Sequence, residues 1–400
     1  MKEFEKKLEK LYFNKELSRG FLLLITARTI VYIAIGLVGL FLPIFLYELF
    51  NYNFQYMVLY FGIGYLLYAL FVPIGAKFLN YFGFRRGLRV SIFLGAFFYI
   101  VFYFINQENM IYLIPLSIFI GLAYKMFYWV PFHVDFSKFS DKKILGKEIS
   151  FLETVKDLIG VIIPIIAGFL IVNFGFDVLF IIAIIIYLIS GIPYLMIPRT
   201  NEKFTWGYFY TWKKYFSKET IKDNLAFAAN GGEDIVGLVV WPIFIFEILQ
   251  GDYLKVGFIA TLIVGVTVIL QLFIGKYLNN KKRNEYILKL GSVFYAIGWI
   301  FKIFILSAFH IFIVDVYHNI MSIFTKIPFD TLTYEIAADQ GHYIDEFTVL
   351  KEMAINFGRA IMLGLIIIVS FYLSIQWTFV LAAIAVILFN LLRQEKIQGS

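Results

Sequence analysis

The sequence has no cysteine and few charged residues, and both absences narrow its class. None of its 400 residues is Cys, which excludes disulfide bonds, Cys-ligated zinc and thiol catalysis. Only 16% of the residues are charged, compared with about 25% in soluble globular domains. A chain with so little charge is neither a soluble enzyme, nor a nucleic-acid-binding module, nor a disordered tail.

Catalytic and nucleotide-binding motifs are also missing. The chain contains no His-Glu-x-x-His, no Gly-x-Ser-x-Gly and no Gly-x-x-x-x-Gly-Lys-Ser/Thr sequence. Of its four histidines, only His318 lies near the middle of an apolar stretch. We therefore expect no enzymatic activity, no ATP-driven pumping, no metal and no cofactor. A coupling ion, H⁺ or Na⁺, is left open.

Apolar residues dominate what is present, at 61% of the chain. A helix needs about 20 apolar residues to cross ~30 Å of hydrocarbon. Twelve stretches are long enough: 21–50, 56–78, 90–105, 110–130, 151–172, 178–197, 225–248, 256–278, 287–306, 308–327, 350–373 and 375–392. The sequence therefore predicts an all-α polytopic membrane protein.

Lysine and arginine alternate between successive connections. They cluster before the first stretch and after the second, fourth, sixth and eighth, whereas residues 51–55, 106–109 and 173–177 contain none. Because positively charged loops stay in the cytoplasm, we expect both termini there. The expected location is the inner membrane of a prokaryote.

Two segments, residues 1–19 and 198–223, combine aromatic residues with lysines, as helices at the headgroup level do. Each is either a membrane anchor or a regulatory docking site. The expected divisions are an interfacial helix (1–19), an N-terminal six-helix bundle (20–198), an amphipathic linker (199–223), a C-terminal six-helix bundle (224–392) and a cytoplasmic tail (393–400).

The two halves of the chain repeat one another. Residues 42–49, LPIFLYEL, recur as residues 241–248, WPIFIFEI, and residues 77–80, KFLN, recur as residues 276–279, KYLN. Both repeats lie 199 residues apart, so they share one register. Six spans in each half give both halves the same orientation, which predicts twelve transmembrane helices in two pseudo-symmetric bundles around a central pathway.

This pattern resembles the Major Facilitator Superfamily over essentially the whole chain. Its signature, Gly-x-x-x-Asp-Arg/Lys-x-Gly-Arg/Lys-Arg/Lys, follows the second and eighth spans. Here Asn80 and Asn279 replace the Asp, so a latch at the cytoplasmic gate must be neutral or built otherwise. The resemblance implies gate residues in both copies: Lys77, Asn80, Arg85, Arg86, Lys276, Asn279 and Arg283.

Charged residues inside the predicted spans need a reason, since each costs ~2.5–3.5 kcal/mol near the bilayer centre. Arg28 is interpreted as a clamp for an anionic substrate or as half of an ion pair with Asp157. Glu233 and Asp234 form a coupling site in a helix broken at Gly231-Gly232, or pair with Arg359. The candidates for substrate or ion binding are Arg28, Asn230, Glu233, Asp234, Trp241, Asp315, His318, Asn319, Asn356 and Arg359.

Asp315, His318 and Asn319 share one helical face, because their spacings are i, i+3 and i+4. They form either a proton or polar-substrate site, or a set of interhelical hydrogen bonds.

Further polar residues lie toward the cytoplasmic ends of the fourth, fifth and eleventh spans. These predict gate contacts rather than substrate contacts: Lys125, Trp129, Glu153, Lys156, Asp157 and Glu352.

The sequence thus predicts a monomeric secondary transporter, surrounded by lipid, that moves a small polar organic solute by alternating access, with proton coupling as a hypothesis. One alternative is an efflux pump or flippase for hydrophobic compounds. The Arg of the family's antiporters would fall near Ser117, which counts against a drug/proton antiporter. A non-transporting sensor or scaffold is the alternative from another class.

Overall fold

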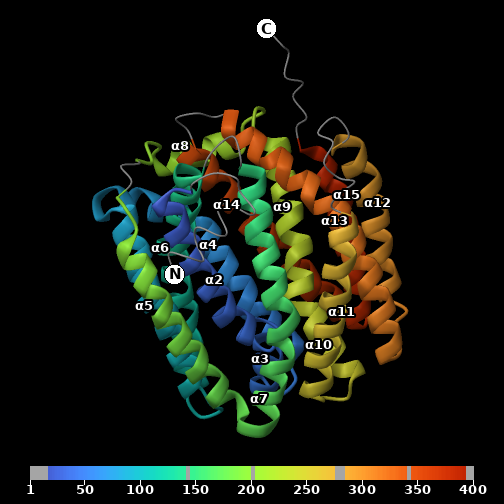
Figure 1. The fold of residues 1–400 in the computed structure, drawn as a ribbon. Coiled ribbons are helices and arrows are strands. Elements are labelled where there is room, and N and C mark those ends of the chain that lie inside the picture. The colour runs from blue at the N-terminus through green and yellow to red at the C-terminus, as the bar shows by residue number, and fades with distance from the viewer. Residues whose placement is uncertain (1–16, 141–144, 200–202, 275–283, 340–343, 393–400) are drawn as a thin grey trace.

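The computed structural model describes residues 17–140, 145–199, 203–274, 284–339 and 344–392, and within them the chain forms helices and no strand. Long helices lie side by side, and the short helix α8 lies across one end (Figure 1). We call that end the linker end and the opposite one, where α3 and α10 lie, the short-loop end.

The helices follow the expected order in both halves. The N-terminal half contains α2 (Arg19–Gly39), α3 (Leu42–Leu49), α4 (Phe54–Phe82), α5 (Phe84–Phe104), α6 (Met110–Phe139) and α7 (Leu145–Met196). After α8 (Tyr208–Tyr215) come α9 (Ile221–Ile235), the π-helical turn η2 (Val236–Val240), α10 (Trp241–Ile248), α11 (Tyr253–Ile274), α12 (Asn284–Lys302), α13 (Ala308–Asp339), α14 (Ile344–Ser370), η5 (Ile375–Thr378), α15 (Phe379–Leu388) and η6 (Phe389–Leu391).

Eight helices in the described ranges are long and apolar enough to cross a membrane. One of them, Thr154–Met196, contains two of the stretches expected from sequence. Gly175 interrupts that helix with a φ of 78°, a conformation that side chains with a Cβ avoid. The bend at Gly175 therefore separates the fifth and sixth expected spans.

Matching boundaries carry the sequence repeat into the structure. Helices α3 and α10 each have 8 residues, with proline as the second residue. They begin 199 residues apart, at Leu42 and Trp241. The following helices, α4 and α11, also begin 199 residues apart, at Phe54 and Tyr253.

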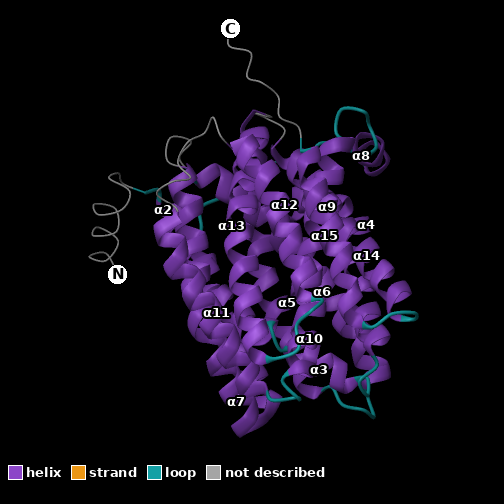
Figure 2. Ribbon diagram, turned by 90° about the vertical axis from the view of Figure 1, so that its right-hand side faces the viewer, coloured by secondary structure: helices purple, strands orange, loops and turns teal. Residues whose placement is uncertain are grey.

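The two halves contact each other along several pairs of elements, including α6 with α14. Helix α4 packs on α14, α7 on α11, and α3 on α10 (Figure 2). At the short-loop end, the Tyr47 hydroxyl donates to Glu247 Oε1 at 2.7 Å. Between α7 and α11, a Cβ on Gly257 would lie 2.3 Å from the Pro164 carbonyl oxygen, so only glycine permits this approach.

The expected break at Gly231-Gly232 is wrong, because both glycines lie inside the regular helix α9. They allow close packing instead: a Cβ on Gly231 would lie 2.1 Å from the Ile355 carbonyl oxygen of α14. The irregular turn comes later, at η2, directly before the Trp241-Pro242 pair.

The linker contacts both halves at their linker ends. Asn80 of α4 donates through Nδ2 to the Phe204 carbonyl oxygen at 2.7 Å and accepts from the Phe204 N–H at 2.9 Å. The N–H and hydroxyl of Thr205 both donate to Glu346 Oε1 of α14, at 3.0 and 2.6 Å. Two consecutive linker residues are thus bound to opposite halves. The expected interfacial helix at 1–19 and the tail at 393–400 lie essentially outside the described residues.

Candidate functional site

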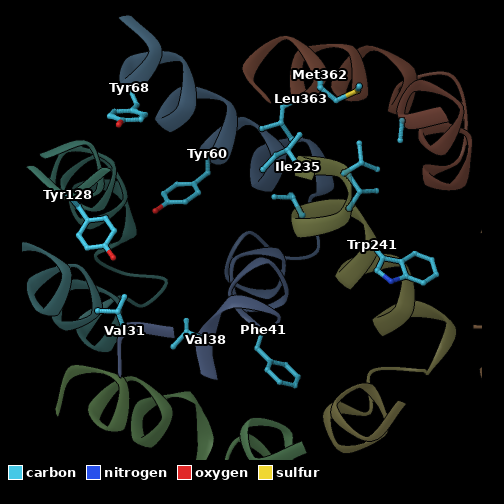
Figure 3. Packing of buried hydrophobic residues seen from close by; sticks show 14 of the residues in the cluster. Val31, Val38, Phe41, Tyr60, Tyr68, Tyr128, Ile235, Trp241, Met362 and Leu363 are labelled. Carbon is cyan, nitrogen blue, oxygen red and sulfur yellow. The ribbon is translucent and has the colours of Figure 1, made fainter. Parts of the chain in front are cut away.

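Arg28 lies in a cluster of rings between α2 and α6. Its side chain is buried, and Nη1 donates to the Tyr128 hydroxyl at 2.6 Å. The guanidinium carbon lies 4.2, 4.8 and 4.9 Å from the ring centres of Tyr32, Trp129 and Phe132. Figure 3 shows the side chain of Tyr128 pointing inward from α6. The structure therefore surrounds Arg28 with a hydroxyl and rings, instead of the carboxylate partner considered from sequence.

A stacked pair links this cluster to the C-terminal half. Trp129 stacks on His133, with ring centres 5.7 Å apart. His133 Nε2 lies 3.5 Å from Glu352 Oε1 of α14. The predicted gate residues Trp129 and Glu352 are therefore brought together through His133, which sequence reasoning had not selected. Asn356, buried on the same helix, donates to the Glu352 carbonyl oxygen at 2.7 Å.

Asp234 and Arg359 form an ion pair that faces the other half. Arg359 Nη2 lies 2.6 Å from Asp234 Oδ2, as one of the two sequence interpretations expected. The Arg359 guanidinium carbon lies 5.1 Å from the ring centre of Tyr65 on α4, and Lys125 Nζ of α6 lies 3.9 Å from the same ring. The side chains of Asp234 and Arg359 are 32% and 22% exposed, so this pair is open to a solute.

Glu233 points away from Asp234, into the C-terminal bundle. Its Oε2 lies 3.2 Å from Lys326 Nζ, and its Oε1 accepts hydrogen bonds from Tyr295 at 2.5 Å and Trp299 at 3.2 Å. Adjacent residues on a helix point about 100° apart, so only one of the two carboxylates can face the neighbouring half.

Asp315 pairs with a lysine that the sequence reading missed. Lys302 Nζ of α12 lies 2.8 Å from Asp315 Oδ1, and both residues are buried. Trp241 Nε1 donates to Asp315 Oδ2 at 3.2 Å, and Lys302 Nζ also lies 3.9 Å from the Trp241 ring centre. A paired and hydrogen-bonded carboxylate is the form in which buried charge is tolerated.

His318 is separated from this pair and lies among rings. The ring centres of Tyr295 and Trp299 are each 4.6 Å from that of His318. Its Nδ1 is buried without a hydrogen-bond partner in the described structure. The expected Asp315–His318–Asn319 site is therefore not assembled as a unit. Asn230 and Asn319 are both half-buried.

The signature residues after α4 act within the N-terminal half or on the linker. Arg85 donates to the Leu195 carbonyl oxygen at 3.2 Å, and Arg89 donates to the same oxygen. Cations at a helix C-terminus satisfy carbonyl groups that the helix leaves open. Lys77 and Arg86 are exposed, and Asn80 holds Phe204. In the described residues, Arg85 therefore makes a helix-end contact and Asn80 makes a neutral linker contact.

Several predicted gate residues lie beyond what the structure describes. Lys276, Asn279 and Arg283 fall in the range 275–283, and the side chain of Glu153 is also outside the description. Lys156 is exposed and close enough to Asp234 to act on it electrostatically, and Asp157 is half-buried.

Sequence reasoning missed Lys302 and Lys326 although both lie in predicted spans. The rule that intramembrane charges need partners would have selected them. Tyr295 and Trp299 carried no such signal, because the chain is rich in aromatic residues throughout.

Two packed halves built of long apolar helices, with charged residues between them, define the class of protein. The family model of the Major Facilitator Superfamily matches residues 24–344, and the chain belongs to that family. It is therefore an integral membrane protein and, in general terms, a secondary transporter of small molecules and not an enzyme. "Uncharacterized protein YqgE" of Bacillus subtilis (strain 168) is similar to it, with 24% identity over 376 residues that cover 89% of this chain and 84% of that protein.

Proposed function

We propose that the chain moves a small polar organic solute by alternating access, coupled to protons. The proposal includes twelve crossings in two pseudo-symmetric bundles, with both termini in the cytoplasm of a prokaryote. The matching bounds of α3 with α10 and of α4 with α11 support the duplication. The alternation of positively charged connections supports the orientation.

The pair Asp234–Arg359 is the observation that carries the proposal. It lies on the surface of one half, contacts Tyr65 of the other half and keeps part of each side chain exposed. A polar solute entering between the halves meets a carboxylate, a guanidinium and a phenol within one site. An apolar compound would gain nothing from these groups and would leave them desolvated.

Asp234 is the carboxylate best placed to carry a proton. Glu233 and Asp315 are each held by a lysine and by ring N–H or O–H donors inside the C-terminal bundle. Asp234 forms its ion pair with Arg359 and keeps an exposed side, while Lys156 and Lys326 act on it electrostatically. Protonating Asp234 would release Arg359 toward the other half, which couples proton binding to a rearrangement between the halves.

The absence of cysteine makes alternating access directly testable. A Cβ on Gly62 of α4 would lie 3.7 Å from the Leu363 Cβ of α14, across the two halves, which is the spacing of a disulfide. A disulfide in G62C/L363C should hold α4 and α14 together and stop uptake by proteoliposomes, and reduction should restore it. The same pair without oxidant is the control. Full uptake by the oxidised, cross-linked protein would contradict alternating access.

The solute and the coupling ion are tested in the same proteoliposomes. A panel of sugars, amino acids, peptides, organic anions and organic cations is offered with and without a pH gradient. Asp234→Asn should abolish the gradient's effect on uptake, whereas Asp177→Asn, a change at an exposed residue, should not. Uptake that ignores the gradient, with Asp234→Asn and Asp315→Asn fully active, would remove proton coupling. No movement of any solute would favour the sensor or scaffold.

A further inference from the structure

We infer that the ring cluster around Arg28 is a binding site for a small organic carboxylate. This inference rests on the proposed function, since it names the class of solute that the pathway takes. The site comprises Arg28, Tyr32, Tyr128 and Trp129, with Lys125 one turn away on α6.

Arg28 differs from the interior cations of the C-terminal half in having no carboxylate beside it in the described structure. Lys302, Lys326 and Arg359 each lie within 3.2 Å of a carboxylate oxygen. The described contacts of the Arg28 guanidinium are one phenol oxygen and four aromatic rings. Its Nε is buried without a hydrogen-bond partner. A buried cation with unused donors is costly unless an anion completes it.

Lys125 adds a second positive charge on the same face. It is one turn before Tyr128 and Trp129 on α6, since i, i+3 and i+4 side chains are neighbours. Its Nζ lies over the Tyr65 ring at 3.9 Å. The acid across the interface that acts electrostatically on Lys125 is Glu352. The Glu352 carboxylate also faces His133, at 3.5 Å, so Lys125 and His133 share it. Together Arg28 and Lys125 leave the N-terminal wall of the interface positive.

The shape of the cluster selects the kind of anion. A guanidinium presents parallel N–H groups that match the two oxygens of a carboxylate. The rings of Tyr32 and Trp129 are half-buried, so their free edges can cover the planar or apolar body of a small acid. Inorganic phosphate offers no such body, and an anionic lipid presents its charge at the headgroup level rather than within the bundle.

The test compares each acid with its amide in the thermal unfolding of the purified full chain. The pairs are acetate with acetamide, lactate with lactamide and benzoate with benzamide, and the protein is held in phosphatidylcholine nanodiscs. At least one acid should raise the melting temperature and quench the fluorescence of Trp129, while its amide does neither. Trp129 is the one tryptophan before residue 206, so Trp129→Phe identifies its signal.

Arg28→Gln should weaken binding of that acid by at least about tenfold, since it removes charge-assisted hydrogen bonds. Arg19→Gln is the matched control, because Arg19 is exposed on the same helix. If Arg28→Gln does not fold, Arg28→Lys keeps the charge, loses the planar fork and should still weaken binding.

Three results would overturn the inference: acids and amides acting alike, Arg28→Gln binding as tightly as wild type, or phosphatidylglycerol or inorganic phosphate reproducing the full effect. Transport of a neutral or cationic solute, unchanged in Arg28→Gln, would leave the transporter standing and remove the carboxylate. Tight binding of an acid, with no transport of any solute, would leave the carboxylate site standing and remove the transporter.

Discussion

In the C-terminal half, buried cations face carboxylates, whereas in the N-terminal half Arg28 faces rings and a hydroxyl. The residue 199 positions after Arg28 is Phe227, which packs against Phe329 and Phe347. The two halves share matching helix boundaries at α3 with α10 and at α4 with α11, yet their interior cations have different surroundings. Lys302, Lys326 and Arg359 of the C-terminal half each face a carboxylate, whereas Arg28 of the N-terminal half faces none in the described structure. On the inference above, the paired charges of the C-terminal half stabilise its fold, whereas Arg28 of the N-terminal half is available to bind an anion.

Breaking the Lys302–Asp315 pair should have the largest effect on stability. Lys302→Met leaves a buried carboxylate unpaired, and losing one partner of such a pair costs about 3–5 kcal/mol. Lys302→Met/Asp315→Asn should recover most of the loss. Arg28→Met orphans no opposite charge and should cost about 1–2 kcal/mol. Unfolding in mixed micelles measures all three, and equal losses in Lys302→Met and Arg28→Met would erase the difference between the halves.

The next largest difference in stability should be that between Gly358→Ala and Gly160→Ala, which change glycines at corresponding positions of the repeat. A Cβ on Gly358 would lie 1.8 Å from the Ala228 carbonyl oxygen, whereas a Cβ on Gly160 would lie 3.6 Å from the nearest atom, in Val264. Gly358→Ala should therefore lower stability by about 1–3 kcal/mol or more. Gly160→Ala should be neutral or gain up to about 1 kcal/mol in helix propensity. Melting temperatures of the two variants decide between these outcomes.

Asn80→Asp should loosen the linker, although it restores the residue of the family signature. The carboxylate cannot donate to the Phe204 carbonyl oxygen and faces it at the distance of the present hydrogen bond, 2.7 Å. A loss of about 1–2 kcal/mol corresponds to roughly 5- to 30-fold faster local opening. Trypsin cleavage after Lys203 reports it, with Lys77→Gln as the control on α4. Unchanged cleavage would mean that Asn80 does not hold the linker.

The smallest expected effect concerns two helix caps that the repeat places 199 residues apart. Asn53 accepts from the Tyr56 N–H and Asp252 from the Lys255 N–H, both at 3.0 Å. Replacing either by Ala should cost about 1 kcal/mol at neutral pH.

Only the Asp252 cap should depend on pH. The backbone N–H of Lys255, followed by its ammonium, lowers the pKa of Asp252. A lowered pKa in the folded state gives stability that is present above about pH 4 and lost as the pH falls through that lowered value. The destabilisation by Asp252→Ala should therefore shrink between about pH 7 and about pH 2, while that by Asn53→Ala stays constant. Melting curves at both pH values test this.

The sequence predicted an all-helical membrane protein and the matching helix starts 199 residues apart, because both depend on local patterns. Lengths of apolar runs and the shared offset of 199 residues need no tertiary information. The pairing of Asp234 with Arg359 was also within reach, as one of two interpretations of the charges in the seventh and eleventh expected spans.

Partner choice inside the C-terminal bundle was beyond the sequence. Asp315 and His318 share a helical face, yet Asp315 turns to Lys302 of α12 while His318 packs on Trp299. That outcome depends on how α12 and α13 are rotated against each other. The Gly231-Gly232 pair was misread for a similar reason, since a glycine that breaks a helix and one that lets a neighbour approach look alike in sequence.

The contacts of Phe204 and Thr205 limit how far the linker ends can separate. Adjacent residues span at most about 3.6 Å of extended chain, so Asn80 and Glu346 are tied together through a tether about one residue long. Any excursion of more than a few ångströms between α4 and α14 at that end must first release one residue or the other. Small fluctuations can therefore leave the hydrogen bonds of Phe204 and Thr205 intact. A full separation of α4 and α14 at the linker end must begin with the breaking of one of these contacts.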